Sequence, residues 1–160
     1  MPSAWLAFYR DNAPDSQGRF LSQIVAWDDA RLEAVHDYIQ WLFPLPEPSA
    51  FNPDAPLLTN ADIAAVRADS TVQANLLAAL QRMLRYYGLT PDTEANPKPW
   101  VCPADHNHLR LTRILRALTL LGLSTEATEL HGAISRYDAV FPERTKRFWR
   151  EALIAQTAAR

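Results

Sequence analysis

Residues 36–48 read HDYIQWLFPLPEP, a run of large apolar side chains that ends in three prolines. Apolar positions at helical spacing continue upstream, so we predict one helix over residues 28–43 with apolar residues on two sides. Each proline lacks a backbone N–H and restricts the residue before it, which stops the helix. We expect this helix to be buried centrally, with His36 and Gln40 as a polar pair on it.

The same helical spacing recurs on both sides of this stretch, and the four glycines are few. Further helices are predicted over residues 20–27, 60–67, 71–87, about 108–121, 124–140 and 142–158. Thr59, Ser70 and Asn107 stand where N-caps are expected, and Gly88 stands where a helix ends. Proline-rich connectors occupy residues 44–58 and 90–105. We predict an all-α fold, a single compact bundle of about seven mostly short helices, with residues 1–160 as one domain.

The composition describes an ordinary folded chain, with 48% hydrophobic residues and a net charge of −2. No overall positive field exists, so no nucleic-acid partner is expected. The one cysteine, Cys102, and an N-terminus without a secretory signal favour a cytoplasmic protein. No apolar run reaches the roughly 20 residues needed to cross a bilayer. The sequence leaves peripheral membrane association and the oligomeric state open.

Two short motifs raise the possibility of metal chemistry. Asp37 follows His36, and residues 102–108 read CPADHNH, which offers Cys102, Asp105, His106 and His108 as ligands. Four ligands so close along one loop rarely reach tetrahedral geometry, and the first pair lacks histidines and aspartates from other helices. We therefore predict no metal, no cofactor and no catalytic residue. A metal-dependent hydrolase that uses both motifs is the alternative.

Two arginine rows follow helical spacing. Arg110, Arg113 and Arg116 share one helix in a stretch without acidic residues. The spacing recurs at Arg144, Arg147 and Arg150. Guanidinium groups on one face can hold a carboxylate or a phosphate, or they can pair with acids on a neighbouring helix. The sequence leaves both readings open.

Several blocks resemble the conserved region of the opioid growth factor receptor family. They are FYR (8–10), WDD (27–29), LE (32–33), HDYIQWLFPL (36–45), PSAFNPDAPLL (48–58), MLRYYGL (83–89) and HNHLRLTRILRALTLLGL (106–123). The resemblance implies an all-helical domain without enzymatic activity. It also implies a link to animal receptors for enkephalin-type peptide, which are associated with the nuclear envelope and with restraint of growth.

The chain departs from the animal members of that family in three respects. It ends soon after the resembling region, it carries no basic localisation cluster, and Pro46 stands where the family pattern has arginine. We therefore expect a free-standing member of bacterial type.

The function we predict is a non-catalytic, all-helical binding domain whose ligand is a short peptide or protein segment. Polar groups among aromatic rings suit such a ligand. The candidate ligand-binding residues are His36, Gln40, Trp41, Trp100, His106, Asn107, Arg110 and Arg113. Two alternatives stay open: these polar groups form a buried structural network, or the protein is a structural or assembly protein that acts through a helical interface.

Overall fold

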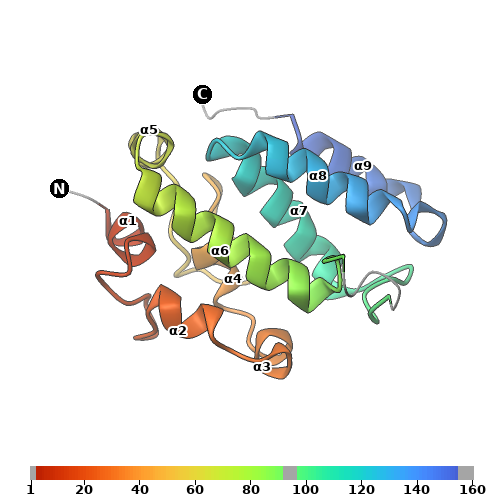
Figure 1. Cartoon of the computed structure of the whole chain (residues 1–160), viewed down its shortest axis with the longest axis horizontal. Coiled ribbons are helices and arrows are strands. Elements are labelled where there is room, and N and C mark those ends of the chain that lie inside the picture. The colour runs from red at the N-terminus through yellow and green to blue at the C-terminus, as the bar shows by residue number, and fades with distance from the viewer. Residues whose placement is uncertain (1–2, 92–96, 155–160) are drawn as a thin grey trace. The chain divides into compact units, whose positions relative to one another are not determined.

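The computed structural model describes residues 3–91 and 97–154. These residues form nine α-helices and one 3-10 helix (Figure 1). Their only strand-like pairing is an isolated bridge between Leu45 and Leu57. The all-α prediction is confirmed. None of the helices in these two ranges has the length and apolar character needed to span a bilayer.

The chain divides into two compact units, Met1–Tyr86 and Tyr87–Arg160. Unit 1 contains α1 (Ala4–Tyr9), α2 (Leu21–Val25), α3 (Asp29–Ala34), α4 (Ile39–Leu42), α5 (Asn60–Arg67) and α6 (Ser70–Tyr87). Unit 2 contains α7 (His106–Leu120), α8 (Ser124–Ser135), the 3-10 helix η1 (Asp138–Val140) and α9 (Glu143–Ala152). The boundary falls one residue before the end of α6.

The predicted continuous helix over residues 28–43 is wrong, because the chain breaks between α3 and α4. Val35 is extended, with φ −95° and ψ 131°. The break lets the Tyr38 hydroxyl donate to the carbonyl of Leu32 over 2.8 Å. That carbonyl belongs to the last turn of α3, where carbonyls have no partner within the helix. α4 is consequently a single turn, and all four of its residues are buried.

The sequence did not predict α1. Side chains of this helix donate hydrogen bonds to the last carbonyls of α4. The Trp5 indole donates to the carbonyl of Trp41 over 2.9 Å, and the Tyr9 hydroxyl donates to that of Leu42 over 2.8 Å. In a longer helix residue 46 would supply the partner of the Leu42 carbonyl, but Pro46 has no N–H. Trp5 and Tyr9 are four residues apart, so both rings point from one side of α1.

The predicted limits of α5 are confirmed at residues 60–67. Thr59 and Asp62 form the expected capping box, in which each side chain accepts from the other's backbone N–H. The predicted N-cap at Ser70 is wrong, because Asp69 accepts from the first turn of α6 instead. Gly88, with φ 70°, follows the end of α6 as predicted.

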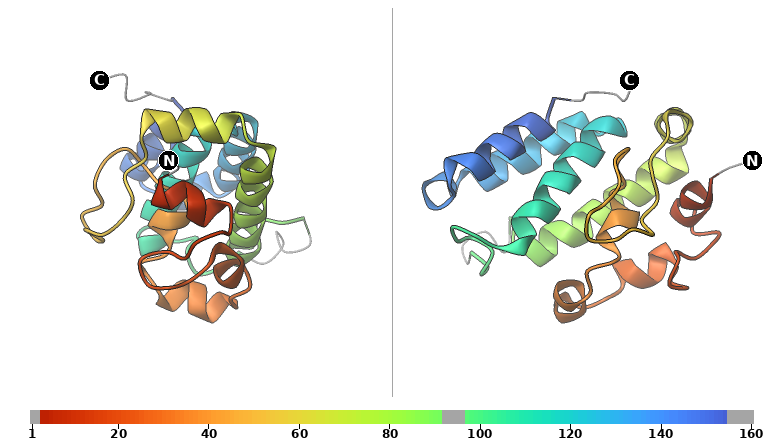
Figure 2. Two further views of the ribbon diagram at one scale, coloured as in Figure 1. Left: turned by 90° about the vertical axis from the view of Figure 1, so that its left-hand side faces the viewer. Right: turned by 180° about the vertical axis from the view of Figure 1, so that it is seen from behind.

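In unit 2, α7 lies against both α8 and α9 (Figure 1), and the three stay side by side when seen from behind (Figure 2). Asp105, rather than Asn107, caps α7 by accepting from the Asn107 N–H over 2.8 Å. The helix predicted over residues 124–140 ends at Ser135. A tighter turn follows, in which the Tyr137 N–H donates to the Ile134 carbonyl three residues earlier. The final helix, predicted over residues 142–158, ends at Ala152, and residues 155–158 of the prediction lie outside the described residues.

Trp100 anchors its proline-rich connector onto unit 2. It is 3% exposed, and its indole donates to the Tyr87 carbonyl over 2.8 Å. Its ring stacks on Phe141 with centroids 5.9 Å apart. Part of this connector, residues 92–96, lies outside the described residues.

Candidate functional site

Three of the predicted site residues lie in unit 1, at the break between α3 and α4. Gln40 and Trp41 are buried, whereas His36 is exposed. The expectation that His36 lies on a buried helix face is wrong, because the break removes it from any helix. The Gln40 side-chain amide donates to the His36 carbonyl over 3.3 Å. Of the three, His36 alone offers its side chain to solvent.

The other five predicted site residues lie in unit 2. Trp100, Asn107 and Arg110 are buried, Arg113 is half-buried and His106 is exposed. The Asn107 side-chain oxygen accepts from the Tyr87 hydroxyl over 3.4 Å and from Arg110 over 3.5 Å. Buried polar groups need such partners, and these bonds hold the start of α7 to the residue that ends α6. Contact between any of the eight residues and a ligand stays a prediction.

The loop after α4 contains a feature that the sequence did not reveal. Phe51 is 80% exposed, yet its loop is held in place. The Ser49 hydroxyl accepts from the backbone N–H groups of Phe51 and Asn52 at 3.2 Å. The Asn52 side-chain amide donates to the carbonyl of Asp37 and to the side-chain oxygen of Gln40, both at 3.4 Å. Gln40 therefore positions a loop that presents an aromatic ring to solvent.

A charged cluster lies beside this loop. Arg19 donates to Asp15 and to Asp37, each over 2.8 Å. Burial is the largest influence on the Arg19 pKa and lowers it, but the hydrogen bonds and charges of the two aspartates together raise that pKa above its ordinary value. Two carboxylates share one guanidinium, so the cluster keeps a net negative charge. The Asp15 side chain is fully buried, but that of Asp37 is 44% exposed.

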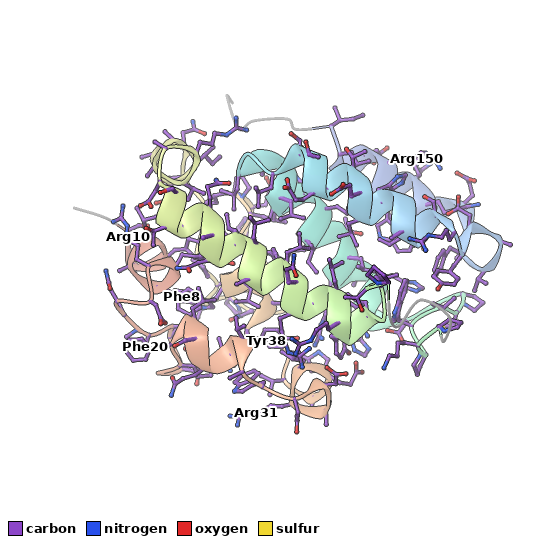
Figure 3. The ribbon with its side chains drawn as sticks, in the orientation of Figure 1. Phe8, Arg10, Phe20, Arg31, Tyr38 and Arg150 are labelled. Atoms are coloured by element: carbon purple, nitrogen blue, oxygen red, sulfur yellow. The ribbon has the colours of Figure 1, made fainter. Side chains whose placement is uncertain are left out.

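Trp27 lies next to the same cluster and is half-buried. The Arg19 guanidinium carbon lies 5.4 Å from the centre of its ring, and that of Arg31 on α3 (Figure 3) lies 4.4 Å away. Its ring also meets Tyr38 edge to face, with centroids 5.5 Å apart. Trp27 is thus an indole whose fluorescence can report on the charged cluster.

The two motifs considered for metal binding make other contacts. Asp37 pairs with Arg19, Asp105 caps α7, and the His108 ring lies 2.8 Å from the Trp100 carbonyl. Across residues 3–91 and 97–154 no three histidine, cysteine, aspartate or glutamate side chains gather as a metal site would require. The hydrolase alternative therefore has no ligand set in this part of the chain.

The protein belongs to the class of all-α domains, because short helices joined by loops make up its described residues. Buried polar groups form hydrogen bonds within each unit. The model of one family, described as "Opioid growth factor receptor (OGFr) conserved region", matches residues 4–98. The chain belongs to the opioid growth factor receptor family, and the resemblance seen in the sequence is confirmed.

Named relatives agree with this assignment. The opioid growth factor receptor of Mus musculus is 36% identical over 135 residues, which cover 74% of this chain and 21% of the relative. That of Homo sapiens is 34% identical over 136 residues, covering 74% and 20%. Opioid growth factor receptor-like protein 1 of Xenopus tropicalis is 30% identical over 166 residues, covering 95% and 30%. The chain thus spans about a fifth to a third of these relatives. No solved structure matches.

Proposed function

We propose that this protein is a non-catalytic, cytoplasmic binding domain whose ligand is a short peptide or protein segment. Relatives named receptors for opioid growth factor support a binding role rather than catalysis. The matched region is only about a fifth of the mouse and human receptors. We therefore infer the kind of ligand from the surface of this chain.

The proposal rests on a surface of unit 1 that is formed by His36, Asp37 and Phe51. We call it the break-loop surface. The three residues are neighbours because Asn52, next to Phe51, donates to the Asp37 carbonyl. Phe51 offers an aromatic ring on a loop whose backbone is held by the Ser49 hydroxyl, which reduces the entropy that the loop loses on binding. The net negative charge of the aspartate–arginine cluster favours a cationic group.

These features fit a peptide with a free amino terminus and an aromatic side chain. The ammonium group would pair with Asp37, and the aromatic side chain would pack on Phe51. We propose that His36 contacts the ligand directly and that Gln40 acts through Asn52. Among the predicted site residues of unit 2, the accessible ones are His106 and Arg113, which stay candidates for further contacts.

The test is a titration of the whole chain with an enkephalin-type pentapeptide, followed by tryptophan fluorescence and by calorimetry. Phe51→Ala should weaken binding about tenfold, because it removes the central apolar contact. Asp37→Asn should weaken binding about three- to tenfold and reduce its dependence on salt. Circular dichroism checks that both variants keep their helices.

Matched controls lie in unit 2. Leu109→Ala truncates another exposed apolar side chain, and Asp138→Asn neutralises another exposed carboxylate. Both should bind the pentapeptide as the unaltered protein does. The proposal fails if the unaltered protein gives no signal at high micromolar peptide, or if Phe51→Ala and Leu109→Ala bind alike.

A further inference from the structure

The last helix of unit 2, α9, has one side fixed in the core. Trp149 is 1% exposed, and its indole donates to the His108 carbonyl over 3.2 Å. Its ring meets Phe141 edge to face, with centroids 4.9 Å apart. Ala152, three residues on, is also buried. This side of α9 therefore has no apolar surface left for a partner.

The outward side of α9 carries an aromatic ring beside two cations. Arg144, Arg147 and Phe148 are exposed and follow the spacing that brings residues to one face of a helix. The guanidinium carbons of Arg144 and Arg147 lie 5.7 Å and 6.0 Å from the centre of the Phe148 ring. We call these three residues the Arg–Phe face. Glu151, also exposed, leaves the face with a net positive charge.

The cations of α9 differ in their partners. Arg150 (Figure 3) donates to Glu143 over 2.6 Å, and Lys146 lies 3.7 Å from the same carboxylate. The hydrogen bond and then the charge of Arg150 lower the pKa of Glu143. Within residues 3–91 and 97–154, Arg144 and Arg147 form no ion pair, and the guanidinium group of each lies near the Phe148 ring. Their guanidinium groups keep their donors available.

We propose that the Arg–Phe face binds an acidic segment of a partner protein that carries an apolar side chain between carboxylates. Planar guanidinium groups pair with carboxylates through two parallel hydrogen bonds, which a flexible lysine does not match. The apolar side chain packs on Phe148 between the two ion pairs. The face lies outside residues 4–98, which the family model matches, and shares no residue with the break-loop surface.

Two other polyanionic partners fit the face less well. Proteins that bind nucleic acid through its phosphates make on the order of six to ten such contacts. This face offers two cations, Arg144 and Arg147, and the chain as a whole has a net charge of −2. Insertion into a membrane interface needs a broad apolar side, but Trp149 is buried within unit 2 and Phe148 is only 40% exposed. One ring beside two cations suits a short acidic segment.

The test uses a fluorescein-labelled synthetic peptide in which glutamates flank a leucine, with anisotropy measured on the whole chain. Arg144→Gln and Arg147→Gln should each weaken binding about three- to tenfold, and Phe148→Ala about tenfold. Affinity should fall as the salt concentration rises from about 50 to about 200 mM, because salt screens the two ion pairs. A peptide with glutamine in place of glutamate should not bind measurably.

Matched variants separate this face from general charge effects. Arg85→Gln removes an exposed arginine of α6, and Leu109→Ala removes an exposed leucine of α7, so both should bind the acidic peptide normally. Equal binding of the glutamine peptide, or equal losses in Arg85→Gln and Arg144→Gln, overturns the proposal. So does tighter binding to a single-stranded oligonucleotide or to phosphatidylserine vesicles. The pentapeptide titration is independent, so either proposal can fail alone.

Discussion

Tyr9 shows how much one side chain contributes to this fold. Its ring is fully buried, and its hydroxyl donates to the carbonyl that ends α4. Figure 3 labels its two neighbours in the sequence, Phe8 on α1 and Arg10 directly after it. Burial raises the pKa of Tyr9 above its ordinary value of 10.0, because a phenolate would lose its hydration there. The folded protein therefore keeps this phenol neutral.

At neutral pH we expect Tyr9→Phe to lower the free energy of unfolding by about 1–2 kcal/mol, because the Leu42 carbonyl stays buried without its donor. A raised pKa contributes stability that is complete below pH 10.0 and is lost as the pH rises further. The unaltered protein should thus lose stability above that pH more steeply than the variant. Urea unfolding across this pH range measures both effects. The other tyrosines titrate in both proteins and therefore cancel in the comparison. Parallel curves of unfolding free energy against pH would contradict the prediction.

At the scale of elements, side-chain caps decide where α1, α3, α5 and α6 begin. The Asp62 carboxylate closes the capping box of α5 and also accepts from the Ser3 hydroxyl over 2.7 Å. Ser3 in turn caps α1 by accepting from the Leu6 N–H over 3.1 Å. One buried carboxylate thus joins the starts of two helices that are far apart in the sequence.

Replacing Asp62 by alanine should lower the free energy of unfolding by about 1–3 kcal/mol, because two hydrogen bonds to a buried group are lost. Thr59→Ala, which removes only the capping side of the box, should cost about 1 kcal/mol. Asp54→Ala in the exposed loop is the matched control and should change stability by less than about 0.5 kcal/mol. Chemical denaturation ranks the three variants, and a control as unstable as Asp62→Ala would refute the role given to the cap.

The start of α6 depends on charge as well as on capping. The Asp69 carboxylate accepts from Thr71 N–H at 3.0 Å and Val72 N–H at 3.2 Å, and it pairs with Arg10 at 3.0 Å. The Val72 N–H first, and then the Arg10 side chain, lower the pKa of Asp69 below its ordinary 3.8. A lowered pKa contributes stability that is present above pH 3.8 and lost as the pH falls through the folded value.

Asp69→Asn should flatten this acid dependence. Asparagine keeps an oxygen that accepts from the first turn of α6, but it loses the charge that attracts Arg10. We expect the variant to be less stable than the unaltered protein at neutral pH and to lose less stability below pH 3.8. Thermal unfolding followed by circular dichroism at several pH values provides the measurement. Identical acid dependence in the two proteins would show that Asp69 does not contribute to it.

At the scale of the whole molecule, the two units raise the question of how many transitions unfolding has. The sequence predicts one domain over residues 1–160, and the boundary between the units lies within α6. Domain boundaries usually fall in flexible linkers, whereas this one falls in the last turn of α6, so we propose that the units unfold together. A variant that weakens only unit 2 tests this.

Trp149→Ala is that variant, because its ring and its indole N–H both lie within the core of unit 2. The substitution should lower the free energy of unfolding by about 3–5 kcal/mol. In scanning calorimetry one transition should move to lower temperature as a whole. Two transitions, of which only one moves, would show that the units unfold independently.

The sequence predicted the break-loop surface only in part. His36 and Gln40 were singled out as polar groups beside aromatics, and Gln40 does bond to the His36 carbonyl. Phe51 and Asn52 are not among the site residues predicted from the sequence, although PSAFNPD places an aromatic residue among turn formers. Nothing in local pattern shows that Asn52 reaches back 15 residues to Asp37.

The sequence alone determined the features whose causes are local. Thr59 and Asp62 start α5, Gly88 follows α6, and three prolines end the stretch at residues 36–48, because capping, left-handed backbone and a missing N–H act within a few residues. The break after Ala34 in the predicted helix over residues 28–43 depends instead on the tertiary structure. The compensating bonds, from Tyr38 to the end of α3 and from α1 to the end of α4, form only when the chain folds back on itself.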